Sequence, residues 1–214
     1  YLKREDLTPV RSYKLRGAFN AMRKVLAADP SRNLFVCASA GNHAQGVAYM
    51  CKHFGVKGVI FMPVTTPQQK IFKTKVFGEG SIEVRLVGDY FDDTLAAAQA
   101  FCVEAGGTFL SPFDDEDVIE GQASVAAEIM SQLGRAPDRV VLPVGGGGLA
   151  AGVTSFFGKN THFTLVEPEG GLSLVAALEN GGPVTLAHVD GFVDGAAVAR
   201  IGEKTFARLA KTDL

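Results

Sequence analysis

The sequence lacks several features that mark common classes of protein. Its 214 residues contain no tryptophan and only three cysteines, and the cysteines form no Cys-x-x-Cys pair. An odd number of widely spaced cysteines in apolar surroundings argues against a disulfide scaffold and fits a reducing compartment. The four histidines form neither a His-Glu-x-x-His motif nor a Cys/His cluster. We therefore expect no metal site of the zinc type.

An excess of charge of one sign is also missing. The chain carries 21 Lys and Arg against 23 Asp and Glu, which gives a net charge of −2. That balance offers no basic surface for nucleic acid or for an anionic membrane. No apolar run approaches the roughly 20 residues that a membrane-spanning helix needs, and the first residues are charged, unlike a secretory leader. We therefore expect a cytoplasmic protein that binds neither nucleic acid nor membrane.

Glycine, by contrast, is abundant. The chain has 25 glycines in 214 residues, about 12% against roughly 7% in average proteins. They show no Gly-X-Y period, which excludes collagen. Glycine without repeats, in a chain that is 47% hydrophobic, indicates places where the backbone approaches a ligand closely.

Short β-rich runs alternate with longer helical periods along the chain. Strands are expected at residues 34–37, 56–62, 82–87, 108–110, 140–144 and 163–166, and helices at 18–26, 42–54, 67–77, 92–104, 117–133 and 149–157. This alternation predicts an open α/β fold with parallel strands and right-handed crossovers. Ligands of such sheets bind beyond the carboxyl ends of the strands, so the turns that follow strands are candidate sites.

One such turn contains four consecutive glycines, Gly145 to Gly148, between an expected buried strand and a helix that begins at Leu149. A row of bare N–H groups at a helix N-terminus is suited to a phosphate. A flexible surface turn is the alternative. A second alternative is a Rossmann dinucleotide site, because residues 146–151 match Gly-x-Gly-x-x-Ala and Glu167 ends the next strand.

A second turn, Ser39-Ala40-Gly41-Asn42-His43, also lies between a strand and a helix. Ser39 and Asn42 are residue types that cap helices, so simple capping is one interpretation. The other is a site for a carboxylate, formed by these side chains and free N–H groups. The residues alone leave both open.

A third feature is Lys14, which precedes the helix expected at 18–26. A lysine at a helix entrance is usually a solvated surface residue. The neighbours Tyr13, Leu15 and Phe19 also allow a partly apolar site, in which desolvation would lower the lysine pKa and favour the neutral amine that covalent catalysis requires.

Together these segments resemble one family, the fold-type-II pyridoxal-phosphate enzymes, and within it the threonine/serine dehydratase branch. Residues 12–18 resemble the lysine motif Ser-x-Lys-x-Arg-Gly-Ala, residues 39–48 the asparagine loop, and residues 145–148 the tetraglycine phosphate loop. The resemblance implies two open, mostly parallel sheets with helices on both faces and the cofactor in the cleft between them. It assigns residues 1–30 and 115–214 to a large domain, incomplete at both ends, and residues 31–114 to a small one.

The resemblance also implies residue roles. Lys14 would hold pyridoxal 5'-phosphate covalently and move protons of the substrate. Asn42 would bind the ring oxygen of the cofactor, and Gly195 would lie along its ring. The other implied groups are the phosphate binders Gly145, Gly146, Gly147, Gly148 and the Leu149 N–H, and the carboxylate loop Ser39, Ala40, Gly41, Asn42 and His43.

At two places the sequence differs from other members of this family, and each difference excludes a property. Serine racemases of the family carry a serine where this chain has Ala40, so we do not expect racemisation. The carboxylate Glu167 is present, but Gly171 and Ser173 stand where a divalent-metal site would need further ligands. We therefore expect no metal.

The implied activity is deamination of L-threonine to 2-oxobutanoate and ammonia, a step of isoleucine biosynthesis, with L-serine converted to pyruvate as a side reaction. A homodimer or homotetramer is expected. The chain shows no segment like the one that faces the pyridine nitrogen in the family. An inactive fragment that keeps the fold therefore stays open as an alternative, beside the Rossmann-type nucleotide enzyme.

Overall fold

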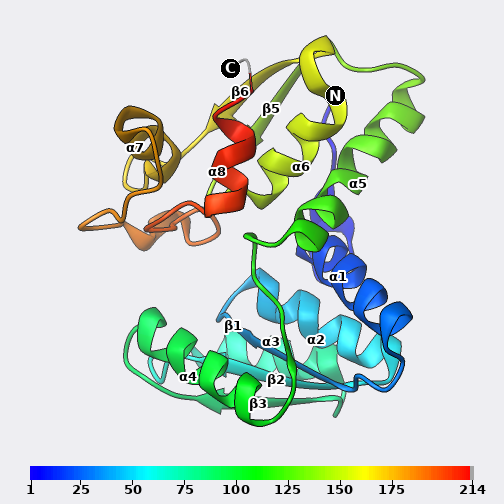
Figure 1. The fold of residues 1–214 in the computed structure, drawn as a ribbon, viewed down its shortest axis with the longest axis vertical. Coiled ribbons are helices and arrows are strands. Elements are labelled where there is room, and N and C mark those ends of the chain that lie inside the picture. Colours follow the sequence, from blue (N-terminus) through cyan, green and yellow to red (C-terminus); the bar gives the residue numbers. More distant parts are fainter. Residues whose placement is uncertain (213–214) are drawn as a thin grey trace. The chain divides into compact units, whose positions relative to one another are not determined.

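The computed structural model describes residues 1–212, which form two compact units, one that ends at Pro112 and one that begins at Phe113. We call these the first and the second unit (Figure 1). Among residues 1–212, no helix has the length and apolar character needed to cross a membrane.

The first unit is a parallel sheet between helices. Its strands follow the order β3-β2-β1-β4, and every pair in the sheet is parallel, with Val36 opposite Val59 in β1 and β2. Its elements are the 3-10 helix η1 (Glu5–Leu7), α1 (Lys14–Ala28), β1 (Leu34–Ala38), α2 (Asn42–Phe54), β2 (Lys57–Met62), α3 (Gln68–Gly78), β3 (Ile82–Leu86), α4 (Phe91–Glu104) and β4 (Thr108–Phe109).

Helices cover both faces of this sheet. Because side chains alternate along a strand, Val36 and Phe61 share the face on which Ala98 and Cys102 of α4 form a buried cluster. On the other face α2 approaches so closely that a Cβ at Gly58 would lie 2.7 Å from Cys51 Sγ. The open α/β fold predicted from the sequence is confirmed.

The second unit is built on a parallel pair of strands. Val141 of β5 lies opposite Thr164 of β6. The elements are α5 (Glu116–Leu133), β5 (Arg139–Pro143), α6 (Gly148–Phe157), η2 (Gly158–Asn160), β6 (His162–Val166), α7 (Ser173–Asn180), η3 (Gly191–Val193) and α8 (Glu203–Leu209). Helix α5 packs against α6, and α6 against α8.

Three details differ from the sequence predictions. Helix α1 begins at Lys14 instead of residue 18, because the strong helix formers Lys14, Leu15 and Arg16 extend it toward the N-terminus. The strand at 140–144 was expected to be buried, but it is partly exposed to solvent, with Val141 64% exposed. The reason is that, within the described part of the second unit, β5 pairs with β6 alone. Helices α7 and α8 were not predicted.

The boundary between the two units falls at Pro112 and Phe113. The sequence-based assignment of residues 1–30 to the larger domain stays a prediction. Within the first unit, α1 packs against α2.

The contact between α5 and α6 gives a test of the second unit's packing. A Cβ at Gly152 would lie 2.6 Å from Ile119 O and 2.8 Å from Ala123 N. Both are backbone atoms that cannot turn aside, so we expect Gly152→Ala to lower the free energy of unfolding by about 1–2 kcal/mol, despite the higher helix propensity of alanine. Urea unfolding of the full-length protein measures this change.

Gly182→Ala is the matched control, because a Cβ there meets nothing within 4 Å. We expect its effect to stay within about 0.5 kcal/mol. Equal stability of the two variants would show that the helices do not pack as closely as described.

Candidate active site

Lys14 is the first residue of α1 and is half-buried. Its Nζ donates a hydrogen bond of 2.5 Å to the carbonyl oxygen of Pro112 and lies 5.7 Å from the centre of the Tyr13 ring. Burial lowers the pKa of Lys14 to about 8 and raises that of Tyr13 to about 12. The structure therefore provides an amine that loses its proton far more readily than an ordinary surface lysine.

The start of α1 is held in place by an ion pair. Arg16 Nε and Nη2 donate to the two carboxylate oxygens of Glu5 at 2.7 and 2.9 Å, and both side chains are largely buried. Such a bidentate pair has fixed geometry. The arginine of the lysine motif thus anchors the segment before α1.

Gly46 brings the lysine and the asparagine loop together. This residue lies in the second turn of α2, and a Cβ here would lie 3.1 Å from Leu15 N and 3.2 Å from the carbonyl carbon of Lys14. A glycine inside a helical pattern is the sequence signal for such a close approach. Gly46 belongs to the asparagine-loop motif of residues 39–48, but the motif alone predicts no role for it.

The loop from Ser39 to Asn42 is not a simple cap. Gly41 occupies the N-cap position of α2, and no side chain caps the helix. Ser39 Oγ accepts from Gly41 N at 3.2 Å, while the Asn42 side chain is exposed. The interpretation of Ser39 and Asn42 as helix caps is therefore wrong. Because the first N–H groups of a helix lack partners within it, those at the start of α2 are free to bind an anion.

His43 is buried, in contrast to its neighbours. Its side chain is 3% exposed, and Nε2 lies 2.9 Å from the carbonyl oxygen of Leu110. Burial, and to a smaller extent the charge of Lys14, lowers the pKa of His43 to about 3. The ring is neutral near pH 7, so His43 can contribute to a carboxylate site only through its main-chain N–H.

In the second unit, residues 145–147 direct their carbonyl groups toward protein donors. Gly146 O accepts from Thr205 Oγ1 at 2.8 Å, and Gly147 O accepts from Ala151 N at 2.8 Å. Ser173 Oγ lies 3.4 Å from Gly145 O. With the carbonyls engaged, the N–H groups at the start of α6 remain for a ligand.

Packing and backbone conformation explain glycine at Gly146 and Gly147 of this turn. A Cβ at Gly146 would lie 2.2 Å from the Phe113 ring, and Gly147 has φ +88°, a conformation that favours glycine. Residues 146–148 are buried. The alternative of a flexible surface turn is therefore wrong, and the turn is a rigid cradle of the kind a phosphate group needs.

The segment around Gly195 borders this cradle. A Cβ at Gly145 would lie 3.0 Å from the Cα of Ala196. Gly195 itself is exposed, and a Cβ there would meet nothing within 4 Å. The structure thus places the glycine turn beside Ala196 within the second unit, while phosphate binding by this turn and the contact of Gly195 with a cofactor ring stay predictions.

The side chain of Glu167 is engaged in hydrogen bonds within the protein. Its Oε1 accepts from Leu174 N at 2.7 Å and its Oε2 from Val175 N at 3.0 Å, which caps the start of α7. A Rossmann site would need this carboxylate for a ribose hydroxyl. The Rossmann alternative thereby loses its acidic residue.

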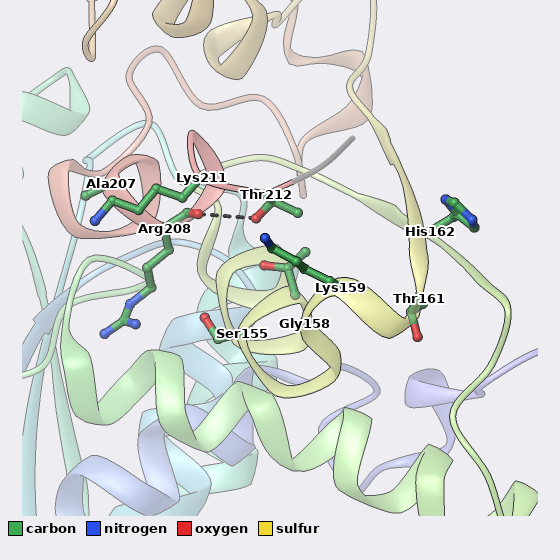
Figure 2. Close-up of a pocket in the computed structure, with 10 residues that line it drawn as sticks. Ser155, Gly158, Lys159, Thr161, His162, Ala207, Arg208, Lys211 and Thr212 are labelled. Atoms are coloured by element: carbon green, nitrogen blue, oxygen red, sulfur yellow. Dashed lines mark hydrogen bonds between the residues drawn. The ribbon is translucent and has the colours of Figure 1, made fainter.

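A polar pocket of about 310 Å³ lies elsewhere in the second unit, beside the C-terminal ends of α6 and α8 (Figure 2). Its basic residues are Lys159, Arg208 and Lys211, and Arg208 pairs with Glu116. The carbonyl ends of helices carry partial negative charge, so these cations complement the helix ends. No residue of the predicted site lines this pocket.

In the part of the chain that the structure describes, no group of three or more His, Cys, Asp or Glu residues is arranged to hold a metal ion. The absence of a metal stays a prediction from the sequence.

The buried His43 ring predicts a pH dependence of stability. Its pKa is about 3 when folded and about 6.5 when unfolded. The unfolded chain therefore binds the proton first, and stability that is complete above pH 6.5 is lost as the pH falls toward 3. Between pH 7 and pH 5 we expect this residue to remove about 2 kcal/mol.

Urea unfolding of wild type and His43→Gln at both pH values measures this loss. Glutamine keeps a donor for Leu110 O but does not titrate, so the variant should lose about 2 kcal/mol less than wild type over this interval. Parallel pH dependence of the two proteins would contradict a buried neutral histidine.

Comparison with known proteins shows to which family the chain belongs. The family model described as "Pyridoxal-phosphate dependent enzyme" matches residues 1–213. The biosynthetic L-threonine dehydratase IlvA of Bacillus subtilis is 49% identical over 212 residues, which cover 98% of this chain and 50% of that protein. The chain spans about half the length of the curated relatives it matches.

Solved structures of threonine deaminases are also similar to this chain. The processed form of threonine deaminase isoform 2 from Solanum lycopersicum is 42% identical, with a TM-score of 0.88 over 98% of this chain and 60% of that one. A second threonine deaminase, from T.th., is 34% identical, with a TM-score of 0.87 over 98% of this chain and 68% of that one. The predicted resemblance, fold class and pyridoxal-phosphate cofactor are confirmed, and the chain belongs to the family of pyridoxal-phosphate dependent enzymes.

Proposed function

We propose that this chain forms part of an ammonia-lyase that deaminates L-threonine to 2-oxobutanoate and ammonia, with conversion of L-serine to pyruvate as a side reaction. The observation that carries the proposal is Lys14, a half-buried amine with a pKa of about 8, whose main chain lies against Gly46 of α2. The names of the relatives, threonine dehydratase and threonine deaminase, support this choice of substrate.

The described residues fit the cofactor in both units. At pH 7.5 roughly a quarter of an amine with pKa 8 is neutral, against about a thousandth for an ordinary lysine, so Lys14 is suited to a covalent bond with the cofactor. Gly145, Gly146, Gly147 and Gly148, with the Leu149 N–H, would hold the phosphate. Asn42 would bind the ring oxygen, and Gly195 would lie along the ring.

Ser39, Ala40, Gly41, Asn42 and His43 would receive the substrate carboxylate. Ser39 Oγ and the main-chain N–H groups at the start of α2 supply the donors. Ala40 offers only a methyl group, which cannot exchange a proton with substrate. That side chain therefore supplies no second base for racemisation.

When bound, the cofactor would supply an electron sink for the bonds at the substrate Cα. The Lys14 amine would take the Cα proton, and its ammonium form would donate a proton to the β-hydroxyl group as that group leaves. The neutral His43 ring adds no competing charge beside this amine. Loss of water from threonine and its later return during hydrolysis balance to 2-oxobutanoate and ammonia.

The pathway, the cellular location, the oligomeric state and the partners of the enzyme are further predictions. A biosynthetic role is supported by the names of the relatives. The isoleucine pathway, a cytoplasmic location and a homodimer or homotetramer stay predictions from the sequence. The expected absence of nucleic-acid and membrane partners also stays a prediction from charge and composition.

Replacing Lys14 tests this function. In the full-length protein we expect Lys14→Ala to lower ammonia release from L-threonine by about 10³-fold or more, because the variant lacks the group that moves both protons. The assay measures ammonia and 2-oxobutanoate at saturating cofactor.

Lys24→Ala, in the same helix, is the control and should keep wild-type turnover. Absence of threonine deamination in the wild type would contradict the proposal and favour an inactive chain. Full activity of Lys14→Ala would contradict the role of the lysine.

A further inference from the structure

We propose that Thr205 is a positioning residue that orients the glycine turn toward the cofactor phosphate. This inference rests on the proposed function. It concerns a side chain in α8, a helix that the sequence analysis did not predict.

The contact that carries the inference is short and fully buried. Thr205 is 0% exposed, and its Oγ1 lies 2.8 Å from Gly146 O and 3.1 Å from Gly202 O. A hydroxyl group has one proton, and the shorter contact gives it to Gly146. The main-chain N–H of Gly202 also points to the Gly146 carbonyl, at 3.5 Å.

Fixing this carbonyl also fixes an amide. The carbonyl of Gly146 and the N–H of Gly147 belong to one planar trans peptide, so they point in opposite directions. Glycine on both sides leaves this plane unusually free to rotate, and Gly147 adopts φ +88°. A donor that holds Gly146 O inward therefore keeps Gly147 N–H turned outward, where a phosphate oxygen can accept from it.

The donor is itself held firmly. The Asp114 carboxylate accepts from the N–H groups of Glu203 at 3.1 Å, Lys204 at 2.8 Å and Thr205 at 3.2 Å. The preceding residue, Phe113, places its ring where a Cβ of Gly146 would be. Phe113 thus fixes the turn directly through its ring, and Asp114 fixes it indirectly by holding the start of α8.

Two possible roles of Thr205, orienting the Gly147 N–H or only stabilising α8, predict different effects on ligand binding. If Thr205 only stabilised α8, its loss would weaken all cofactor forms alike. If it orients Gly147 N–H, its loss weakens a ligand that carries a phosphate more than the same ligand without one.

The experiment compares pyridoxal 5'-phosphate with pyridoxal. Apo forms of the full-length wild type, Thr205→Val and Thr205→Ser are titrated with each compound, and binding is followed by visible absorbance. We expect Thr205→Val to weaken pyridoxal phosphate about tenfold, since a buried carbonyl loses its partner, and pyridoxal less than about twofold. Thr205→Ser keeps the hydroxyl group and should restore the preference for the phosphate form.

Thr74→Val is the matched control. Thr74 is also 0% exposed, and its Oγ1 donates to a carbonyl, that of Lys70 in α3. We expect this variant to bind both compounds like the wild type. Thermal unfolding of each apoprotein shows whether a variant has lost its fold.

Each outcome is decisive. An equal loss for both compounds, or no loss, in a folded Thr205→Val protein overturns the positioning role. If the wild type binds pyridoxal phosphate no better than pyridoxal, the proposed phosphate turn itself is wrong. If the wild type binds neither, the proposed function fails independently of Thr205.

Discussion

The site depends on the partial burial of one amine. Water stabilises an ammonium group far better than a protein interior does, and Lys14 exchanges part of its water for contacts with the Pro112 carbonyl and the Tyr13 ring. Its pKa therefore falls to about 8. The ion pair between Arg16 and Glu5 and the close approach permitted by Gly46 keep α1 where this burial is possible.

The two units, each taken by itself, hold different kinds of candidate groups. The first supplies the titrating amine and the N–H groups at the start of α2. The second supplies a rigid turn whose carbonyls are engaged by Thr205 Oγ1 and by the N–H of Ala151. Both candidate loops join a strand to a helix, which is where ligands bind in open α/β folds. Glycine serves two purposes here, since Gly46 allows helices to approach and Gly147 allows a backbone conformation that other residues avoid.

Much of this arrangement could be predicted from the sequence, because the pattern is local. Short β-rich runs located the strands of the first unit to within about a residue, and helix α2 was predicted with its observed bounds. Helices α7 and α8 could not be found in this way. They are capped by Glu167 and Asp114, and Asp114 is 90 positions away from Lys204 in the sequence. The neutral state of His43 likewise depends on Leu110, a distant partner.

The most direct test of the central claim is to locate the covalent cofactor. The full-length protein is loaded with pyridoxal 5'-phosphate, reduced with borohydride, digested, and examined by peptide mass spectrometry. The account predicts the added mass on Lys14, in the peptide from the start of α1. Modification of another lysine in place of Lys14, or a reduced protein without added mass, would contradict it.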